Sequence, residues 1–261
     1  MAHKIEWTDK TANPFTGCVH GCPYCYARKF SKRLAGKAGT VYHRLAESGV
    51  DPFTPAIHLD ALRALDDELS RSRRSRKIFL GSMADLGCRS HWKITDCDVG
   101  VASVSSSVTP ALVHSRVKKL ISSHPYHTFQ ILTKNPEGLA GSWPRNAWIG
   151  VSVESTRAAS LRVPALLAHV SSGCLWVSVE PLLDEDFDPS ALVVAGRVPG
   201  WIVIGAETGR RSPRSASEAL ALTEAARRIL VFANEQGIPV FVKRNMRELD
   251  LGEHWPRRFP R

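Results

Sequence analysis

Three cysteines stand close together near the beginning of the chain, in the segment Gly17-Cys-Val-His-Gly-Cys-Pro-Tyr-Cys25. Cys18, Cys22 and Cys25 are separated by three and then two residues, and thiolates are strong ligands for zinc and for iron–sulfur clusters. Gly17 and Gly21 permit the tight loop that would bring the thiols together. The segment therefore predicts one metal centre, for which two chemistries are open.

The two chemistries differ in the number of protein ligands that they need. A structural zinc site has four ligands, so His20, His43 or a distant cysteine would have to complete it. A four-iron, four-sulfur cluster held by three cysteines leaves one iron open, and an open iron can bind and reduce a cofactor or substrate. The three thiols alone do not choose between them.

The other cysteines are scattered along the chain. Cys88, His91 and Cys97 match no familiar metal-binding spacing, and Cys174 stands far from all of them. We interpret these residues as buried or incidental. In a reducing compartment, the clustered thiols indicate metal binding or catalysis rather than disulfides.

Six short runs of apolar and β-branched residues recur along the chain and predict the elements that must position these groups. Near-continuous apolar runs are typical of parallel strands buried on both faces. The six predicted strands are residues 77–82, 128–133, 147–152, 175–180, 201–206 and 239–243. Apolar residues at helical spacing predict helices over 59–70 and 217–236. This alternation predicts an α/β fold, either a barrel or a doubly wound sheet.

Each predicted strand ends in polar residues, and the carboxyl ends of parallel strands meet at one rim. The polar endings are Ser82 with Asp85, Thr133 with Lys134, Ser152 with Glu154, Ser178 with Glu180, Glu207 with Thr208, and Lys243 with Arg244. Any one pair is also compatible with a helix cap or a solvated turn. Their repetition predicts a polar site large enough for a ligand.

Two further segments carry weaker signals. The basic run 70–77 is either a solvated helix end or a phosphate contact. The stretch 88–110, with its serine run, predicts a loop or an irregular insertion.

Composition indicates a globular chain with a polyanionic partner. Lys and Arg number 35 against 25 Asp and Glu, a formal net charge of +10, which favours nucleic acid. Hydrophobic residues make up 43% and charged residues 23%, which argues against a disordered chain. No apolar run approaches the roughly 20 residues that span a bilayer, and we find no secretion signal. We therefore expect a cytoplasmic protein that does not enter a membrane.

The cysteine segment, with Tyr24 directly before the last cysteine, resembles the signature of the radical S-adenosylmethionine superfamily. More of the chain resembles one group within it, the phage-associated Gp37/Gp68 family of three-cysteine proteins. The resembling segments are residues 5–10, 13–18, 81–86, 129–134, 148–154, 178–182 and 203–209.

This resemblance implies a partial (β/α)6 barrel of the TIM type, open on one side, formed by a single domain over residues 1–261. The cluster loop would be residues 17–26, the barrel elements would run to about residue 245, and residues 246–261 would be a C-terminal tail.

The resemblance also implies two cofactors, a [4Fe-4S] cluster and S-adenosylmethionine. Cys18, Cys22 and Cys25 would hold the cluster. The residues implied to bind S-adenosylmethionine are Tyr24 near the adenine, Ser82, Met83 and Asp85 for the methionine amine, Ser152 or Glu154 for the ribose, and Val179 for the adenine. Glu180, Glu207, Lys134 and Lys243 are the candidates for catalysis or substrate contact, with a structural ion-pair network as the alternative.

The implied function is an enzyme that cleaves S-adenosylmethionine to a 5′-deoxyadenosyl radical, which abstracts a hydrogen atom. With the basic charge and the phage association, the favoured substrate is a nucleic-acid base, in hypermodification of phage DNA within the bacterial host cell. The alternatives are a DNA-repair lyase, or an enzyme acting on a small molecule, a peptide or RNA. An electron donor such as flavodoxin or ferredoxin would be a partner. A non-enzymatic zinc protein that binds nucleic acid is the alternative outside this chemistry.

Overall fold

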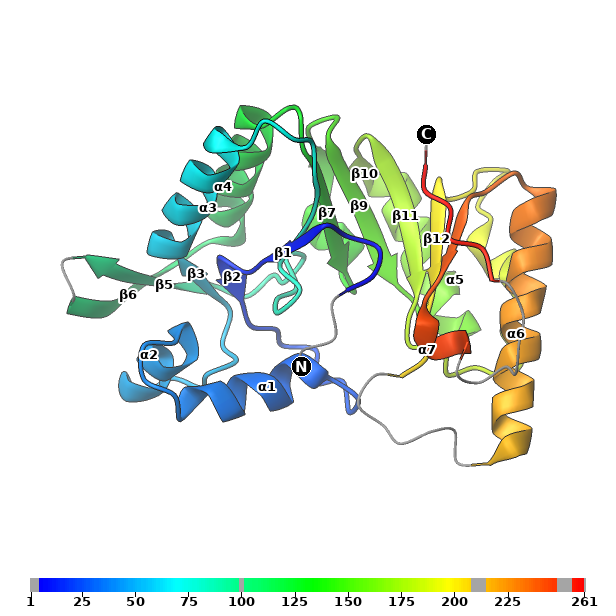
Figure 1. Cartoon of the computed structure of the whole chain (residues 1–261), viewed down its shortest axis with the longest axis horizontal. Helices are drawn as coiled ribbons and strands as arrows, with labels where there is room; N and C mark the ends of the chain where they lie inside the picture. Colours follow the sequence, from blue (N-terminus) through cyan, green and yellow to red (C-terminus); the bar gives the residue numbers. More distant parts are fainter. Residues whose placement is uncertain (1–4, 99–100, 208–214, 248–254, 261) are drawn as a thin grey trace. The chain divides into compact units, whose positions relative to one another are not determined.

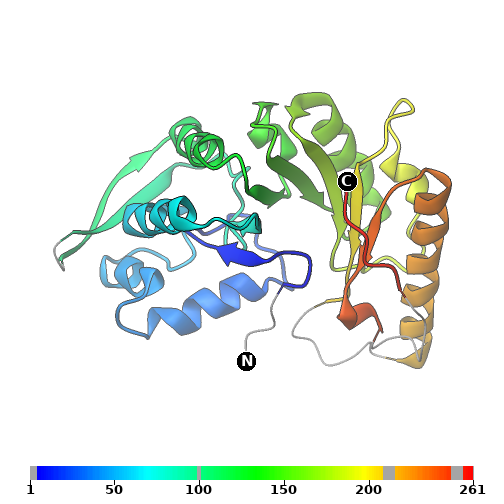
Figure 2. The same ribbon diagram turned by 45° about the horizontal axis from the view of Figure 1, so that its top comes forward.

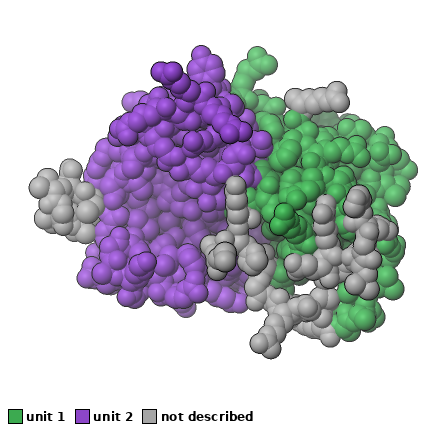
Figure 3. Space-filling view, viewed as in Figure 1, with its two compact units in different colours: residues 1–7, 140–261 green, residues 8–139 purple. Residues whose placement is uncertain are grey.

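The structure is a computed structural model that describes residues 5–98, 101–207, 215–247 and 255–260. The chain divides into two compact units (Figure 3). We call residues 8–139 the cysteine unit, and residues 1–7 with 140–261 the C-terminal unit. Each unit contains parallel strands and helices of its own.

The cysteine unit contains three parallel strands in the order β1, β4, β7. These strands are β1 (Lys10–Ala12), β4 (Lys77–Leu80) and β7 (Thr128–Thr133). Helix α3 (Leu59–Arg71) leads into β4 and helix α4 (Pro110–Ser123) leads into β7. The two helices lie side by side (Figures 1 and 2), and a 2.7 Å contact joins His124 Nε2, at the end of α4, to Asp66 Oδ1 of α3.

A second sheet in this unit corrects one sequence prediction. Its strands are β2 (Phe15–Thr16), β3 (Ala56–His58), β5 (Trp92–Asp98) and β6 (Val101–Val108), in that order. The expectation of a loop over 88–110 was wrong, because β5 and β6 pair antiparallel and β5 also pairs with β3. The serine run has no strand pattern of its own, so pairing with β5, the strand directly before it, specifies β6.

Two helices follow the cysteine segment. Cys25 is the N-cap of helix α1 (Tyr26–Ala35). Thr40 is the N-cap of helix α2 (Val41–Glu47), and its hydroxyl accepts a hydrogen bond from the His43 N–H. Buried Ala27 and Tyr42 pack with Phe53 and Met83 in one small apolar cluster, and Cys18 and Cys25 lie against it. A short helix, η1 (Pro136–Leu139), closes the unit.

The C-terminal unit contains four parallel strands in the order β9, β11, β12, β13. They are β9 (Ala147–Ser152), β11 (Cys174–Val179), β12 (Trp201–Ile204) and β13 (Val240–Val242). The helices of this unit are α5 (Thr156–His169), η2 (Pro189–Leu192), α6 (Ala216–Glu235) and α7 (Arg244–Arg247). A short parallel pair, β8 (Gly141–Ser142) and β10 (Val170–Ser171), completes it.

Tryptophans form the centre of the C-terminal unit. Trp201 packs edge to face with Trp7 and at a tilt with Trp176, at centroid distances of 6.1 and 5.0 Å. Of the predicted tail, residues 248–254 and 261 lie outside the described residues, while the Arg258 N–H donates to the Val240 carbonyl at 2.8 Å. The last described residues are therefore held to β13.

All six predicted strands and both predicted helices are confirmed to within a few residues. The α/β class is confirmed, because parallel strands and helices alternate in both units. Within the described ranges, no helix combines the length and apolar character needed to cross a membrane.

Candidate functional site

The cysteine loop is held by backbone hydrogen bonds to the segment that follows β4. The Gly17 N–H donates to the Met83 carbonyl at 2.8 Å, and the Asp85 N–H donates back to the Gly17 carbonyl at 3.2 Å. Gly17 has a φ of +91°, and a Cβ there would lie 2.2 Å from the Thr54 carbonyl oxygen. Only glycine fits this close approach, so the residue before the first cysteine is fixed by packing as well as by conformation.

Two of the three thiols already accept backbone hydrogen bonds. The His20 N–H donates to Cys18 Sγ and the Arg28 N–H donates to Cys25 Sγ, each at 3.4 Å. Cys25 is also the N-cap of α1, where the free N–H groups and the helix dipole favour negative charge. Arg28 Nη2 donates to the Cys18 carbonyl at 2.9 Å and so ties the start of α1 to the loop.

Burial raises the pKa of the Cys18 thiol to about 12. The His20 N–H opposes this rise, while the negative charges of Asp85, Cys22 and Cys25 add to it. A thiolate at Cys18 therefore requires a positive partner, which is what a bound metal provides.

The three thiols of the loop are the type of ligand that a metal group held by three thiolates requires, and they lie close together along the chain. Among the described residues, no three His, Cys, Asp or Glu side chains converge as the ligands of one metal ion do. Cys18, Cys22 and Cys25 are all partly exposed, so their side chains have room to turn. The loop thus carries a suitable set of ligands whose geometry is not preformed.

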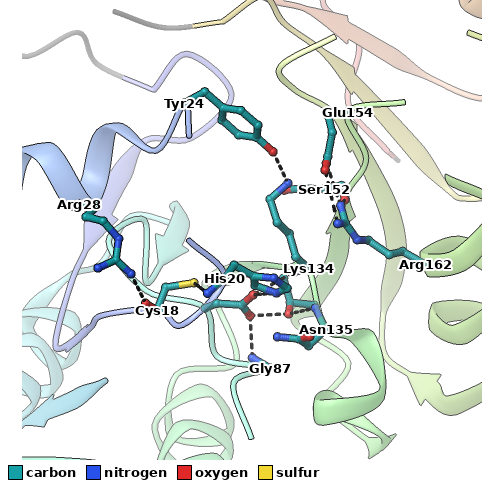
Figure 4. A network of polar contacts seen from close by, with 12 residues as sticks. Cys18, His20, Tyr24, Arg28, Gly87, Lys134, Asn135, Ser152, Glu154 and Arg162 are labelled. Atoms are coloured by element: carbon teal, nitrogen blue, oxygen red, sulfur yellow. Dashed lines mark hydrogen bonds and ion pairs between the residues drawn. The ribbon is translucent and has the colours of Figure 1, made fainter. Parts of the chain in front are cut away.

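Asp85 connects three segments of the cysteine unit, and Figure 4 labels three of the residues around it, His20, Gly87 and Lys134. Its Oδ1 accepts hydrogen bonds from the Gly87 N–H at 2.9 Å and from the Thr133 hydroxyl, and its Oδ2 accepts from the Lys134 N–H at 3.0 Å. His20 Nε2, from the cysteine loop, lies 3.4 Å from the same Oδ2. The carboxylate is only 4% exposed, and both of its oxygens serve the protein itself.

Lys134 and Tyr24 also meet in this unit (Figure 4). Lys134 Nζ donates to the Tyr24 hydroxyl at 2.9 Å and lies 5.4 Å from the centre of the tyrosine ring. The ammonium group at the end of β7 is thereby directed at the residue before the last cysteine.

Ser82 and Met83 are held by two residues that sequence reasoning missed. Asn13 Oδ1 accepts from Ser82 Oγ and from the Met83 N–H, each at 3.0 Å, and the Tyr26 hydroxyl donates to the Ser82 carbonyl at 2.8 Å. Asn13 directly follows β1, so the rule about polar strand ends would have found it. The strand Lys-Thr-Ala has no apolar run, and it was not predicted.

The remaining predicted residues lie in the C-terminal unit. Arg162 of α5 pairs with Glu154 through two hydrogen bonds of 2.8 and 3.4 Å, and it donates to the Ser152 carbonyl at 2.7 Å (Figure 4). Val179 is completely buried, and its carbonyl accepts a hydrogen bond from the Gly205 N–H at 3.1 Å. Glu207 is partly exposed, and Thr208 lies outside the described residues.

Glu180 and Lys243 form an ion pair in the C-terminal unit. They follow β11 and β13, which lie on either side of β12, and the residue after β12 is Gly205. A Cβ at Gly205 would lie 2.9 Å from Lys243 Cδ and 3.1 Å from Glu180 Cγ and Cδ. The glycine therefore leaves the space in which the two side chains meet. Their contact is an ion pair, as in the structural alternative to a role in catalysis or substrate contact.

The cysteines outside the loop fit the interpretation of buried or incidental residues. Cys88 is 1% exposed, and burial raises the pKa of the partly exposed Cys174 to about 12. The side chain of Cys97 lies outside the described residues.

Comparison with known proteins assigns the chain to a family but does not assign an activity. Neither the curated proteins nor the solved structures contain a significant match. One family profile, described as a protein of unknown function (DUF5131), matches residues 2–245. Because this match covers most of the chain, the protein belongs to the DUF5131 family.

Proposed function

We propose that this protein is a radical S-adenosylmethionine enzyme. The observation that carries the proposal is the loop of Cys18, Cys22 and Cys25, joined by backbone hydrogen bonds to the segment after a parallel strand. When bound, a [4Fe-4S] cluster with one open iron supplies the electron that cleaves S-adenosylmethionine to a 5′-deoxyadenosyl radical. The finer fold assignment, a partial (β/α)6 barrel, is part of the same proposal.

The residues of the cysteine unit would then bind and orient the cofactors. Cys18, Cys22 and Cys25 would hold the cluster, with the two N–H···S bonds stabilising their negative charge. The Ser82–Met83 segment, fixed by Asn13, offers backbone acceptors to an ammonium group. Asp85 would position this segment and the cysteine loop rather than bind the amine, because its two oxygens are already used.

The proposal gives Lys134 and the C-terminal unit supporting roles. Tyr24 would lie against the adenine, and Lys134 would orient the tyrosine through its hydroxyl. Glu154 is held by Arg162 in a fixed orientation, as expected for a residue that accepts hydrogen bonds from a ribose. Glu180, Lys243 and Glu207 remain candidates for substrate contact.

The zinc alternative finds less support. His20 Nε2 lies 3.4 Å from Asp85 and forms no hydrogen bond with a described residue, but it does not converge with the thiols as a fourth ligand there. His43 is occupied, because its Nδ1 bonds to the Ala35 carbonyl at 2.7 Å and its Nε2 lies 3.1 Å from Glu47. A ligand set of three thiols without a histidine favours the cluster.

The proposed substrate is a base in nucleic acid, with DNA favoured. The formal net charge of +10 supports a polyanionic substrate. The reaction would begin with abstraction of one hydrogen atom from the substrate, and a modified base, as in phage DNA hypermodification, would be the product. An electron donor such as flavodoxin or ferredoxin would supply the electron.

Anaerobic reconstitution with iron and sulfide tests the chemistry. We expect the visible absorbance of an iron–sulfur cluster and, with S-adenosylmethionine and dithionite, formation of 5′-deoxyadenosine. Cys22→Ser should abolish both, whereas Cys174→Ser, a partly exposed cysteine outside the loop, should abolish neither. Stoichiometric zinc, with no 5′-deoxyadenosine from the wild-type protein, would contradict the proposal.

A further inference from the structure

Helix α1 carries a stripe of positive charge on its solvent face. Lys29, Lys32 and Arg33 are exposed on the helix, and exposed Lys37 follows just after its end. Spacings of three and four residues place Lys29, Lys32 and Arg33 on one face of the helix. At the helical rise, Lys29 to Arg33 corresponds to about 6 Å. The opposite face packs inward through buried Ala27 and Ser31.

No acid inside the described structure offsets this charge. The sequence contains no Asp or Glu between Asp9 and Glu47. Within the described ranges, the structure has no ion pair to any of the four stripe cations. Arg33 instead stacks on the Phe30 ring at 4.6 Å. Like charges four residues apart, as at Lys29 and Arg33, destabilise a helix by about 0.2–0.5 kcal/mol.

Other bases of the same unit behave differently. Arg63 of α3 pairs with Asp96 at 2.6 Å, and Arg44 of α2 pairs with Asp60 at 2.9 Å. Arg44 and Arg63 therefore have acidic partners, whereas the four stripe cations have none among the described residues. An anion from outside the chain would offset the repulsion along the stripe.

The stripe leads directly to the cysteine loop. Cys25 is the N-cap of α1, and Tyr26, at the first position of the helix, is 46% exposed. The Tyr26 hydroxyl is fixed by its 2.8 Å bond to the Ser82 carbonyl, so the ring is held in place while part of it faces solvent. An anionic chain lying along α1 would thus arrive at an exposed aromatic ring beside the cysteines.

We propose that the stripe of Lys29, Lys32, Arg33 and Lys37 binds the phosphodiester backbone of a single nucleic-acid strand, and that the Tyr26 ring stacks on one of its bases. Successive cations with an aromatic side chain at one end match the way single strands are bound without sequence preference. A membrane surface would require several exposed large apolar side chains beside the cations, whereas Phe30 and Leu34 of α1 are partly buried. This inference rests on the proposed function, for which it names the surface that guides the substrate to the cysteine loop.

Binding of short labelled DNA and RNA single strands, measured by fluorescence anisotropy over a range of salt concentrations, tests the proposal. The variant K29Q/K32Q/R33Q/K37Q keeps residues with good helix propensity and removes four charges. We expect its affinity at about 0.1 M salt to fall by roughly two orders of magnitude, and the slope of log affinity against log salt to decrease by about 3. K29R/K32R/K37R should bind like the wild-type protein, which separates loss of charge from loss of folding.

A matched control removes the same charge elsewhere in the cysteine unit. Arg71, Arg73, Arg74 and Arg116 are exposed and form no ion pair with any described residue. R71Q/R73Q/R74Q/R116Q should bind within a few-fold of the wild-type protein. An equal loss of affinity in this control would overturn the proposal, because total charge or the basic run 70–77, rather than the stripe, would then account for binding.

Tyr26 has its own test. Tyr26→Leu should weaken binding roughly tenfold, whereas Tyr26→Phe should not, because only the former removes the stacking surface. Binding to only one of the two strands, DNA or RNA, shows which sugar the site accepts. Either result supports the stripe. Stripe-dependent binding to phosphatidylserine vesicles without binding to either strand would overturn the proposal.

Formation of 5′-deoxyadenosine by the wild-type protein without nucleic acid is measured separately. Radical formation without strand binding would overturn this inference and leave the proposed chemistry intact. Strand binding through the stripe without radical formation would contradict the proposed function and support the stripe.

Discussion

Lys134 Nζ donates a hydrogen bond to the Tyr24 hydroxyl at 2.9 Å, across 110 positions of sequence. The backbone N–H of the same lysine donates to Asp85 at 3.0 Å. Lys134, directly after β7, therefore contacts both Tyr24 of the cysteine loop and the Asp85 carboxylate.

A double-mutant cycle measures the energy of the Lys134–Tyr24 contact. We expect Tyr24→Phe and Lys134→Met each to lower the free energy of unfolding by about 1 kcal/mol, with a coupling of about 0.5–1.5 kcal/mol. Urea unfolding of the wild-type protein, the two single variants and the double variant gives this coupling. Strictly additive effects would show that the bond contributes nothing to stability.

Asp85→Asn should be strongly destabilising. The amide keeps the size of the carboxylate, but it removes the charge and turns an NH2 group toward a hydrogen-bond donor. For a buried group with three hydrogen bonds we expect a loss of about 3 kcal/mol in the free energy of unfolding. Asp67→Asn, at an exposed position of α3, is the control and should change stability by no more than about 0.5 kcal/mol. Equal effects of the two variants would refute the role of Asp85 in joining the three segments.

Gly17 and Gly21 form a matched pair within the cysteine loop. Both have positive φ, but an added Cβ meets the Thr54 carbonyl at 2.2 Å at Gly17 and nothing within 4 Å at Gly21. Gly21→Ala should therefore cost only the conformational strain, about 1–2 kcal/mol. Gly17→Ala should cost at least about 2 kcal/mol more, because backbone atoms have to move. Thermal and urea unfolding check the order of the two variants.

The ion pair of Glu180 and Lys243 should stabilise the C-terminal unit. The two side chains are only 20% and 12% exposed, so removal of one leaves the other largely desolvated. We expect Glu180→Gln or Lys243→Met to lower the free energy of unfolding by about 2 kcal/mol. The double variant should lose less than the sum of the two, with a coupling of about 1 kcal/mol. If each single variant is neutral, the pair has no structural role and its substrate role gains weight.

His58 should make the stability of the protein depend on pH. Burial lowers the pKa of its imidazole to about 3, the nearby Arg44 charge adds to this, and Asp60 opposes it. Its ring nitrogens bond to the hydroxyls of Thr16 and Thr95 at 2.7 and 2.6 Å.

Because the folded pKa lies below the unfolded value of 6.5, the unfolded chain takes up this proton first. The contribution of His58 is therefore fully present above pH 6.5 and is lost as the pH falls toward 3, by up to about 1.4 kcal/mol per pH unit. Urea unfolding at several pH values, compared with His58→Gln, isolates this contribution. Parallel curves for the two proteins would count against it.

Local patterns in the sequence were sufficient for the central elements of both units. The runs that form β4, β7, β9, β11 and β12 are apolar along their length, and α3 and α6 show helical spacing. These signals are strong because burial on both faces of a strand, or on one face of a helix, dictates residue type position by position.

Elements without a residue pattern of their own were missed. Strand β1 has only three residues and pairs with the distant β4, while β6 is rich in serine and pairs with β5 directly before it. Asn13, which follows β1, was missed with it. Such strands form because a neighbouring strand supplies their hydrogen bonds, and a single sequence does not name that neighbour.

The sequence by itself determined the thiol spacing, the parallel strands, the polar residues at their ends and the acid-free basic stretch that includes α1. Only the tertiary structure decided which of those polar groups serve the protein. It turned both oxygens of Asp85 toward backbone and side-chain donors, and it placed Glu180 and Lys243 together over Gly205. The physical reason is that burial forces polar groups to find partners, and those partners come from segments that only the fold brings within reach.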